Sequence, residues 1–219
     1  MTRRRDPAWV WMIGAFGGAL ALAVVVLAGY GTGPVGIGQA VRYTARWSFL
    51  FFWLSYAGGA MAILFGPAFA GLARRARALG LAFATALQVH IGLVVWLGVA
   101  IGQIPLRGGV LLFFLVALSC AYLLALLSFG VGTRNLGRLW RPLLFLATTY
   151  ILIAFGADFV PGGLIAFGAD SVPGALAQKT PHWLYAAEYV PFALLSLIAI
   201  PMRLAAFLRR RFGLRSATA

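Results

Sequence analysis

The sequence predicts an all-α integral membrane protein with six transmembrane helices and with both the N- and C-termini in the cytoplasm. Three observations support this prediction: 63% of the residues are hydrophobic and only 10% are charged, apolar stretches recur along the chain, and arginines fall between them in a one-sided pattern. A bilayer core about 30 Å thick needs roughly 20 apolar residues per helix, and the composition lies outside the range of soluble domains. We therefore expect residues 1–219 to form a single six-helix transmembrane domain.

The expected helices are joined by short connections, apart from a longer one before the last helix. They cover residues 8–29, 46–66, 78–102, 108–129, 140–158 and 184–207. The first stretch follows three arginines, as the apolar region of a signal peptide would. It is too long for a signal sequence, however, and it lacks a small-x-small cleavage pattern. We expect it to be a retained membrane anchor.

Small residues support close packing of the first three stretches. The first contains Gly14 and Gly18, at the four-residue spacing that lets two membrane helices approach closely. The second is apolar apart from a few residues such as Ser55 and Tyr56. The third repeats the small-residue spacing at Ala76, Gly80, Ala84 and Gln88.

The last three stretches have their own marks. The fourth holds Cys120, the only cysteine of the chain, so neither an intramolecular disulfide nor a thiolate metal cluster is expected. The fifth contains Tyr150 after two threonines, which suits hydrogen bonds between helices. The sixth follows Pro181, a residue suited to the first turn of a helix.

The basic residues predict the orientation of the helices. When the helices alternate through the membrane, 14 of the 18 lysines and arginines fall on one side: Arg3, Arg4, Arg5, Arg74, Arg75, Arg77, Arg134, Arg138, Arg141, Arg203, Arg209, Arg210, Arg211 and Arg215. The other side receives Arg42, Arg46, Arg107, Lys179, Asp158, Asp170 and Glu188. Loops rich in Lys and Arg stay in the cytoplasm. The net charge of +14 therefore indicates topology and contact with anionic headgroups, not nucleic-acid binding.

The longer connection contains a tandem repeat of twelve residues, within residues 155–178. FGADFVPG at 155–162 recurs as FGADSVPG at 167–174. Val-Pro-Gly is a turn signal, so two hairpin-like turns are expected, which present Asp158 and Asp170. Two carboxylates are too few for a hard cation, which prefers about six oxygen ligands. A local duplication in a surface loop is the favoured explanation.

His90 is the candidate functional residue, because an ionisable group inside a membrane helix marks a functional site by default. It is one of two histidines and lies at the centre of the third stretch. Three roles suit it: an axial ligand of heme iron, a member of a proton path, or a hydrogen-bonded packing residue. A proton path needs other titratable groups in the same layer, and no acidic residue is expected there. The other histidine, His182, is expected to anchor the last helix at the interface.

Several short motifs share the spacing of a known family. They are TARWSF at 44–49, the basic loop at 74–77, LGLAF at 79–83 followed by His90, and LGRLW at 136–140. Over about residues 40–160, the chain resembles the ferric reductase-like transmembrane superfamily. Within it, the heme-binding membrane subunits of bacterial methionine sulfoxide reductase systems are the most similar in pattern.

The resemblance implies b-type heme held between helices and electron transfer from a cytoplasmic donor across the membrane. The family's histidine on the third helix corresponds to His90, whereas its two histidines on the fifth helix correspond to Leu144 and Ala157. We therefore expect an electron-transfer subunit of the bacterial cytoplasmic membrane with a non-standard b-type heme on His90. The iron would be five-coordinate, bound also by Met61 or Tyr150, or shared across a homodimer.

The loss of both histidines on the fifth helix also favours an alternative. In this alternative the chain is a heme-free member of the superfamily that acts as a structural or assembly partner in the membrane. Besides the lipid bilayer, the expected partners are a redox protein or a second copy of the chain. No catalytic residue is identified, so enzymatic activity, flavin content, electron donor and electron acceptor stay open.

Overall fold

The computed structural model describes residues 7–104, 106–129, 137–166 and 182–213. Its main helices are α1 (Ala8–Tyr30), α2 (Pro34–Phe65), α3 (Ala70–Ile101), α4 (Gly108–Ser128), α6 (Trp140–Ala166) and α7 (His182–Arg211), with 3-10 turns at Pro67–Phe69 and Gly137–Leu139. No strand occurs among these described residues, and six helices are long and apolar enough to cross a membrane. The predicted all-α class and the six apolar helices are confirmed.

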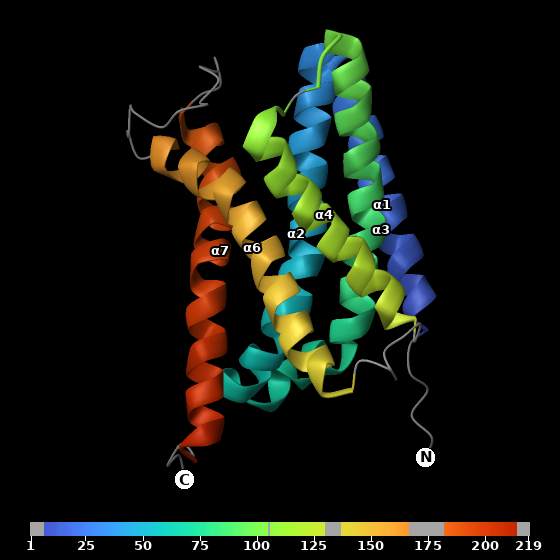
Figure 1. Cartoon of the computed structure of the whole chain (residues 1–219). Coiled ribbons are helices and arrows are strands. Elements are labelled where there is room, and N and C mark those ends of the chain that lie inside the picture. Colours follow the sequence, from blue (N-terminus) through green and yellow to red (C-terminus); the bar gives the residue numbers. More distant parts are fainter. Residues whose placement is uncertain (1–6, 105, 130–136, 167–181, 214–219) are drawn as a thin grey trace.

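The helices form a bundle with α2 near its centre. α3 packs along α2, and α1 packs against both of them (Figure 1). On the other side of α2, α7 packs against α2 and α6, while α4 contacts α6 and α3. α1 begins and α7 ends at the same end of the bundle.

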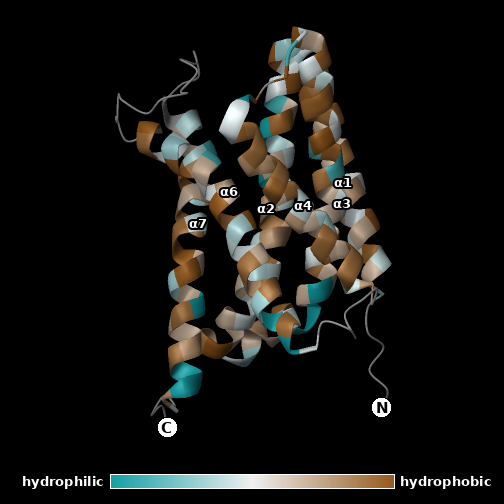
Figure 2. Cartoon of the chain, in the orientation of Figure 1, coloured by the Kyte–Doolittle hydropathy of each residue, from teal (hydrophilic) through white to brown (hydrophobic). Residues whose placement is uncertain are grey.

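We call this end the arginine-rich end, because it carries the basic residues of α3 and α7. We call the opposite end of the bundle the far end. The described arginines of the arginine-rich end include Arg74, Arg75, Arg77, Arg203, Arg209, Arg210 and Arg211. In the ribbon of Figure 2, hydrophobic residues make up most of the bundle, and hydrophilic colour marks the start of α3 and the end of α7. The charge separation expected from the sequence is therefore present in the bundle.

Two helices begin earlier than expected. α2 starts at Pro34 instead of residue 46, and α3 starts at Ala70 instead of residue 78. Pro34 occupies the first turn of α2, where its missing N–H has no helical partner to lose. The added turns are part of the core, since Ile37 and Ala40 are fully buried. Residues 34–45, including Arg42, are thus helical and not an outer loop.

α6 runs on through the first copy of the repeat, so the predicted turn at Val160-Pro161-Gly162 is wrong. Pro161 lies inside α6, which extends to Ala166. A proline within a helix removes one backbone hydrogen bond. Packing offsets this loss, because Phe159 is 1% exposed and the two following glycines face α7. The second copy, including Asp170, lies outside the described residues.

Aromatic rings fill the centre of the bundle. α2 contributes Phe49, Phe52 and Tyr56, which meet rings from α3, α6 and α7. The Phe49 ring centroid lies 5.1 Å from those of both Phe155 and Phe159. Because lipid tails are as apolar as the side chains, packing of this kind is what holds membrane helices together.

Gly162 and Gly156 form a matched pair for testing the contact between α6 and α7. A Cβ at Gly162 would overlap the ring of Tyr189, which is stacked on Tyr185 with centroids 4.6 Å apart. A Cβ at Gly156 would meet only Ser196 Cβ, at an ordinary 3.8 Å. We expect Gly162→Ala to lower stability by about 1–3 kcal/mol through overpacking. Gly156→Ala should keep or raise stability by up to about 1 kcal/mol through helix propensity.

Thermal unfolding of both variants in detergent checks this expectation. Equal effects of the two substitutions would contradict the close approach of α6 to α7.

Candidate functional site

A large cavity lies between α2, α3, α4, α6 and α7, towards the far end of the bundle. Its volume is about 960 Å³, and most of its lining is aliphatic or aromatic. Its polar lining residues are Arg42, His90, Gln103, Asp158 and Tyr189. An apolar cavity with a few polar groups is the usual form of a ligand or cofactor site, and this volume is near the upper limit of about 1,000 Å³ for such sites. We call it the His90 cavity.

His90 lies nearer the far end of α3 than the arginine-rich end. Because α3 begins at Ala70, His90 is preceded by about 30 Å of helix and followed by about 16 Å. The added turns hold Arg74, Arg75 and Arg77, so His90 keeps its place at the centre of the apolar stretch 78–102. The early start of α3 at the arginine-rich end explains the difference.

A main-chain carbonyl orients the imidazole of His90. The Nδ1 atom lies 3.0 Å from the carbonyl oxygen of Val41 on α2. A carbonyl only accepts hydrogen bonds, so Nδ1 carries the proton and the neutral ring keeps an unprotonated Nε2. The hydroxyl of Thr44, 3.5 Å from Nδ1, donates instead to the carbonyl of Ala40 at 2.8 Å. Among the described residues, Nε2 has no hydrogen-bond partner.

This arrangement is the one that metal-binding histidines use. Such histidines almost always donate their other ring N–H to a carboxylate, a carbonyl or a water, which fixes the tautomer and the ring orientation. In His90 the donor is Nδ1 and the acceptor is Val41. The free Nε2 can therefore bind a metal centre or accept a hydrogen bond from a ligand in the cavity.

Asp158 shares the cavity with His90, which the sequence did not predict. The residue was expected in an outer loop, but it lies within α6 and lines the His90 cavity. Arg42 and Arg46 are close enough to interact electrostatically with its carboxylate. His90 and Asp158 line one cavity because α6 continues past residue 158.

A buried ion pair joins α2 to α7 beside this cavity. Arg46 is 5% exposed, and its Nη2 atom lies 3.5 Å from Oε2 of Glu188. Its Nε donates to the main-chain carbonyl of Glu188 at 2.9 Å, and the Tyr43 hydroxyl donates to Oε1 at 2.6 Å. The guanidinium also lies 4.6 Å from the ring centroid of Tyr189.

In the sequence, Arg46 and Glu188 stand out as charges on the outer side, and Arg46 also belongs to the TARWSF motif, but nothing there shows that they form a pair. The two residues are 142 positions apart along the chain, so no local spacing reveals the pair. The one available signal was an arginine at the edge of an apolar stretch, since a charge there needs a partner.

Met61, Tyr150 and Cys120 do not line the His90 cavity. Met61 packs against the aromatic core, and the Tyr150 hydroxyl donates to the carbonyl of Phe113 at 3.2 Å, so neither lines this cavity. Cys120 also packs against the core, and His182 is the first residue of α7. Among the described residues, no three His, Cys, Asp or Glu side chains come together as a metal cluster.

Comparison with known protein families, curated proteins and solved structures gave no match. The chemistry of the site is therefore derived from its own residues.

Removal of the Arg46 side chain tests the ion pair. In an Arg46→Ala variant, the Glu188 carboxylate, which is 15% exposed, loses its cation and keeps the Tyr43 hydroxyl. Breaking one partner of a buried pair costs about 3–5 kcal/mol, so thermal unfolding in detergent should show a large loss of stability. Arg74→Ala, at an exposed arginine on α3, is the control and should change stability by no more than about 0.5 kcal/mol. Equal stability of the two variants would contradict the buried pair.

Proposed function

We propose that the chain is a membrane electron-transfer protein that binds a b-type heme in the His90 cavity, with Nε2 of His90 as an axial iron ligand. One observation carries the proposal. The imidazole is fixed by Val41 through Nδ1, and its unprotonated Nε2 has no partner among the described residues while His90 lines an apolar cavity of about 960 Å³. The resemblance to the ferric reductase-like superfamily supports the same role for His90.

The residues of the cavity fit such a group. His90 supplies a neutral imidazole, and apolar side chains such as Leu87 and Phe155 exclude water around it. Arg42 supplies a positive charge that would balance a propionate. When bound, heme supplies one-electron chemistry, and the axial ligand, hydrogen bonds and burial set its potential.

His90 would hold the heme iron without a second side-chain ligand from the described part of the cavity lining. Met61 and Tyr150 do not line the His90 cavity, and the family's histidine positions on the fifth helix hold Leu144 and Ala157. Leu144 lines a different cavity, nearer the arginine-rich end. His90 is therefore the single nitrogen ligand that the described part of the chain offers to this cavity.

The arrangement of charges supports an orientation in the bacterial cytoplasmic membrane. The arginine-rich end would face the cytoplasm, following the tendency of loops rich in Lys and Arg. The His90 cavity would then lie in the outer half of the membrane. Electrons would pass from a cytoplasmic donor to an outer acceptor, both of them separate proteins.

Absorbance spectroscopy tests the proposal. Purified protein from heme-replete cells should show a Soret band and a dithionite-reduced minus oxidised difference spectrum. His90→Ala should lose both signals, because no other described residue offers a nitrogen ligand in the cavity. Gln88→Ala is the matched control, since Gln88 is exposed on the same helix and does not line the cavity.

A heme signal that survives His90→Ala would refute the ligand assignment. Absence of heme from the folded wild-type protein would refute the proposal and favour the alternative, a heme-free structural or assembly partner. Co-purification with one defined membrane protein, unaffected by His90→Ala, would then identify that role.

Asp158 favours a second candidate function, a proton-coupled membrane carrier. His90, Asp158 and Arg42 line one cavity, which provides the further titratable groups that a proton path needs. Proteoliposomes with a pH-sensitive dye inside would show proton flux that Asp158→Asn abolishes. Flux equal to that of protein-free vesicles would exclude this candidate.

A further inference from the structure

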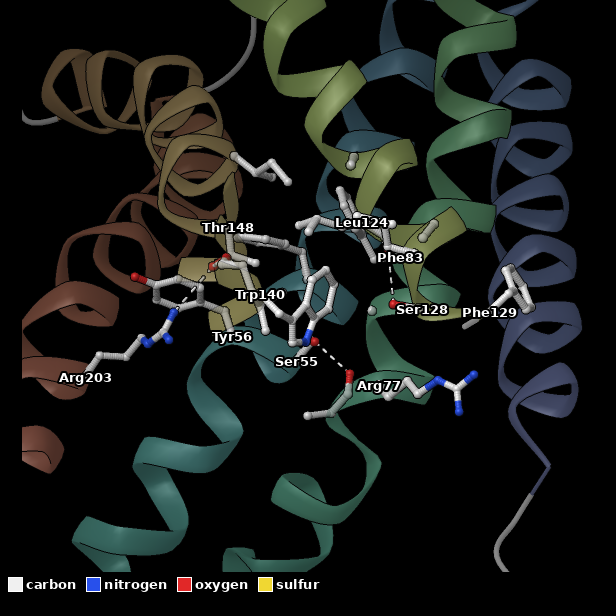
Figure 3. A pocket seen from close by; sticks show the side chains of 18 residues that line it. Ser55, Tyr56, Arg77, Phe83, Leu124, Ser128, Phe129, Trp140, Thr148 and Arg203 are labelled. Carbon is white, nitrogen blue, oxygen red and sulfur yellow. Dashed lines mark hydrogen bonds between the residues drawn. The ribbon is translucent and has the colours of Figure 1, made fainter. Parts of the chain in front are cut away.

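A second cavity lies nearer the arginine-rich end and has a different polar lining. Its volume is about 820 Å³, and residues of α2, α3, α4, α6 and α7 surround it (Figure 3). Phe83, Ala121 and Ile151 line both this cavity and the His90 cavity, so they form the partition between the two. We call it the Arg203 cavity.

Arginines are the charged residues of this cavity. Arg203 of α7 and Arg77 of α3 line it from opposite sides, and no Asp or Glu is among its lining residues. The carboxylate of α7, Glu188, precedes Arg203 by about 22 Å of helix. The other carboxylate of the described residues, Asp158, lines the His90 cavity instead.

Arg203 is held in place without a negative partner among the residues that the structure describes. Its guanidinium lies 4.3 Å from the ring centroid of Tyr56 and 5.0 Å from that of Phe145. Its one hydrogen bond to a described residue is a long contact of 3.5 Å from Nη1 to the Thr148 hydroxyl (Figure 3). A guanidinium has five N–H donors, so most of its donors are left to bind an anion.

The rest of the cavity suits the apolar part of an amphiphile. Phe52, Phe83 and Leu124 give it apolar walls, and Ser55, Ser128 and Trp140 add polar groups. α4 forms one wall and is the least buried of the six apolar helices. One wall of the cavity is therefore a helix that is largely exposed on its other faces.

We propose that the Arg203 cavity binds an anionic phospholipid of the adjoining leaflet, with Arg203 as the residue that binds its phosphate. Basic pockets between membrane helices on the cytoplasmic side bind the headgroups of anionic lipids. A guanidinium in a partly buried site attracts an anion more strongly than it would in water, since the effective dielectric constant is lower. The proposal does not depend on heme at His90.

Lipid titration of the purified full-length chain tests the proposal. Delipidated protein in neutral detergent is titrated with short-chain phosphatidylglycerol, and binding is followed by native mass spectrometry. Arg203→Gln should weaken binding about fivefold, the effect of losing one basic residue near an anionic lipid. Arg210→Gln is the matched control, because Arg210 is an exposed arginine of the same helix outside the cavity. It should change binding by less than about twofold.

Two further variants keep the test independent of folding. Arg203→Lys retains the charge and should bind more tightly than Arg203→Gln. Ala125→Trp fills the cavity from α4 without altering any charge and should also weaken binding. Thermal unfolding without lipid identifies any variant that fails to fold. If Arg203→Gln fails to fold, lipid binding by Ala125→Trp tests the proposal in its place.

The choice of ligand separates the sources of phosphate. Neither inorganic phosphate nor glycerol phosphate at equal concentration should displace phosphatidylglycerol, because both lack the acyl chains of the lipid. Competition by either would overturn the phospholipid assignment in favour of a soluble phosphate. Equal binding of phosphatidylcholine, or equal losses in Arg203→Gln and Arg210→Gln, would overturn the anion site at Arg203.

Discussion

The ion pair between Arg46 and Glu188 joins α7 to α2, together with hydrogen bonds from Trp53 to Leu195 and from Arg209 to Leu64, and both cavities depend on this contact between the two helices. Removing two charges from water costs several kcal/mol per ion, so such a pair is stable only with good geometry and further hydrogen bonds. The Tyr43 hydroxyl and the main chain of Glu188 provide two such bonds, and the Tyr189 ring covers the guanidinium, whose two Nη atoms have no hydrogen-bond partner among the described residues. α7 in turn brings Tyr189 to the His90 cavity and Arg203 to the other cavity. Both sites therefore change if α7 moves relative to α2.

The same segment of α2 controls His90. Val41, whose carbonyl accepts from Nδ1 of His90, lies just over one turn before Arg46. Because a helix turns as a rigid unit over such a distance, the ion pair also fixes the carbonyl opposite the imidazole. Thr44 lies between them, and its hydroxyl donates to the backbone carbonyls of its own helix. It therefore does not donate to Nδ1, which stays protonated. The tautomer of His90 is thus a consequence of how α2, α3 and α7 pack, not of neighbouring residues in the sequence.

The six apolar helices could be predicted because bilayer thickness sets the length of apolar sequence. Helix ends were less predictable. The proline and glycine at 161 and 162 are a turn signal when read locally, but in α6 burial of Phe159 and the close approach to Tyr189 outweigh that signal. His90 stood out as a lone ionisable residue, whereas its acceptor Val41 is 49 residues away and has no side-chain signal. In the sequence, Arg203 is only one of the basic residues that indicate orientation, because no sequence pattern shows which arginines lack a carboxylate nearby.

The two cavities divide the charges of the bundle. The His90 cavity holds Asp158 with Arg42, whereas the Arg203 cavity is lined by arginines without a carboxylate. The partition of Phe83, Ala121 and Ile151 is apolar, so charges on its two sides interact with little screening. A cation at Arg203 favours the reduced state of a redox centre beyond the partition, and an anion bound to Arg203 cancels that effect. If both proposals hold, an anionic lipid in one cavity lowers the reduction potential of heme in the other, which couples electron transfer to the composition of the membrane.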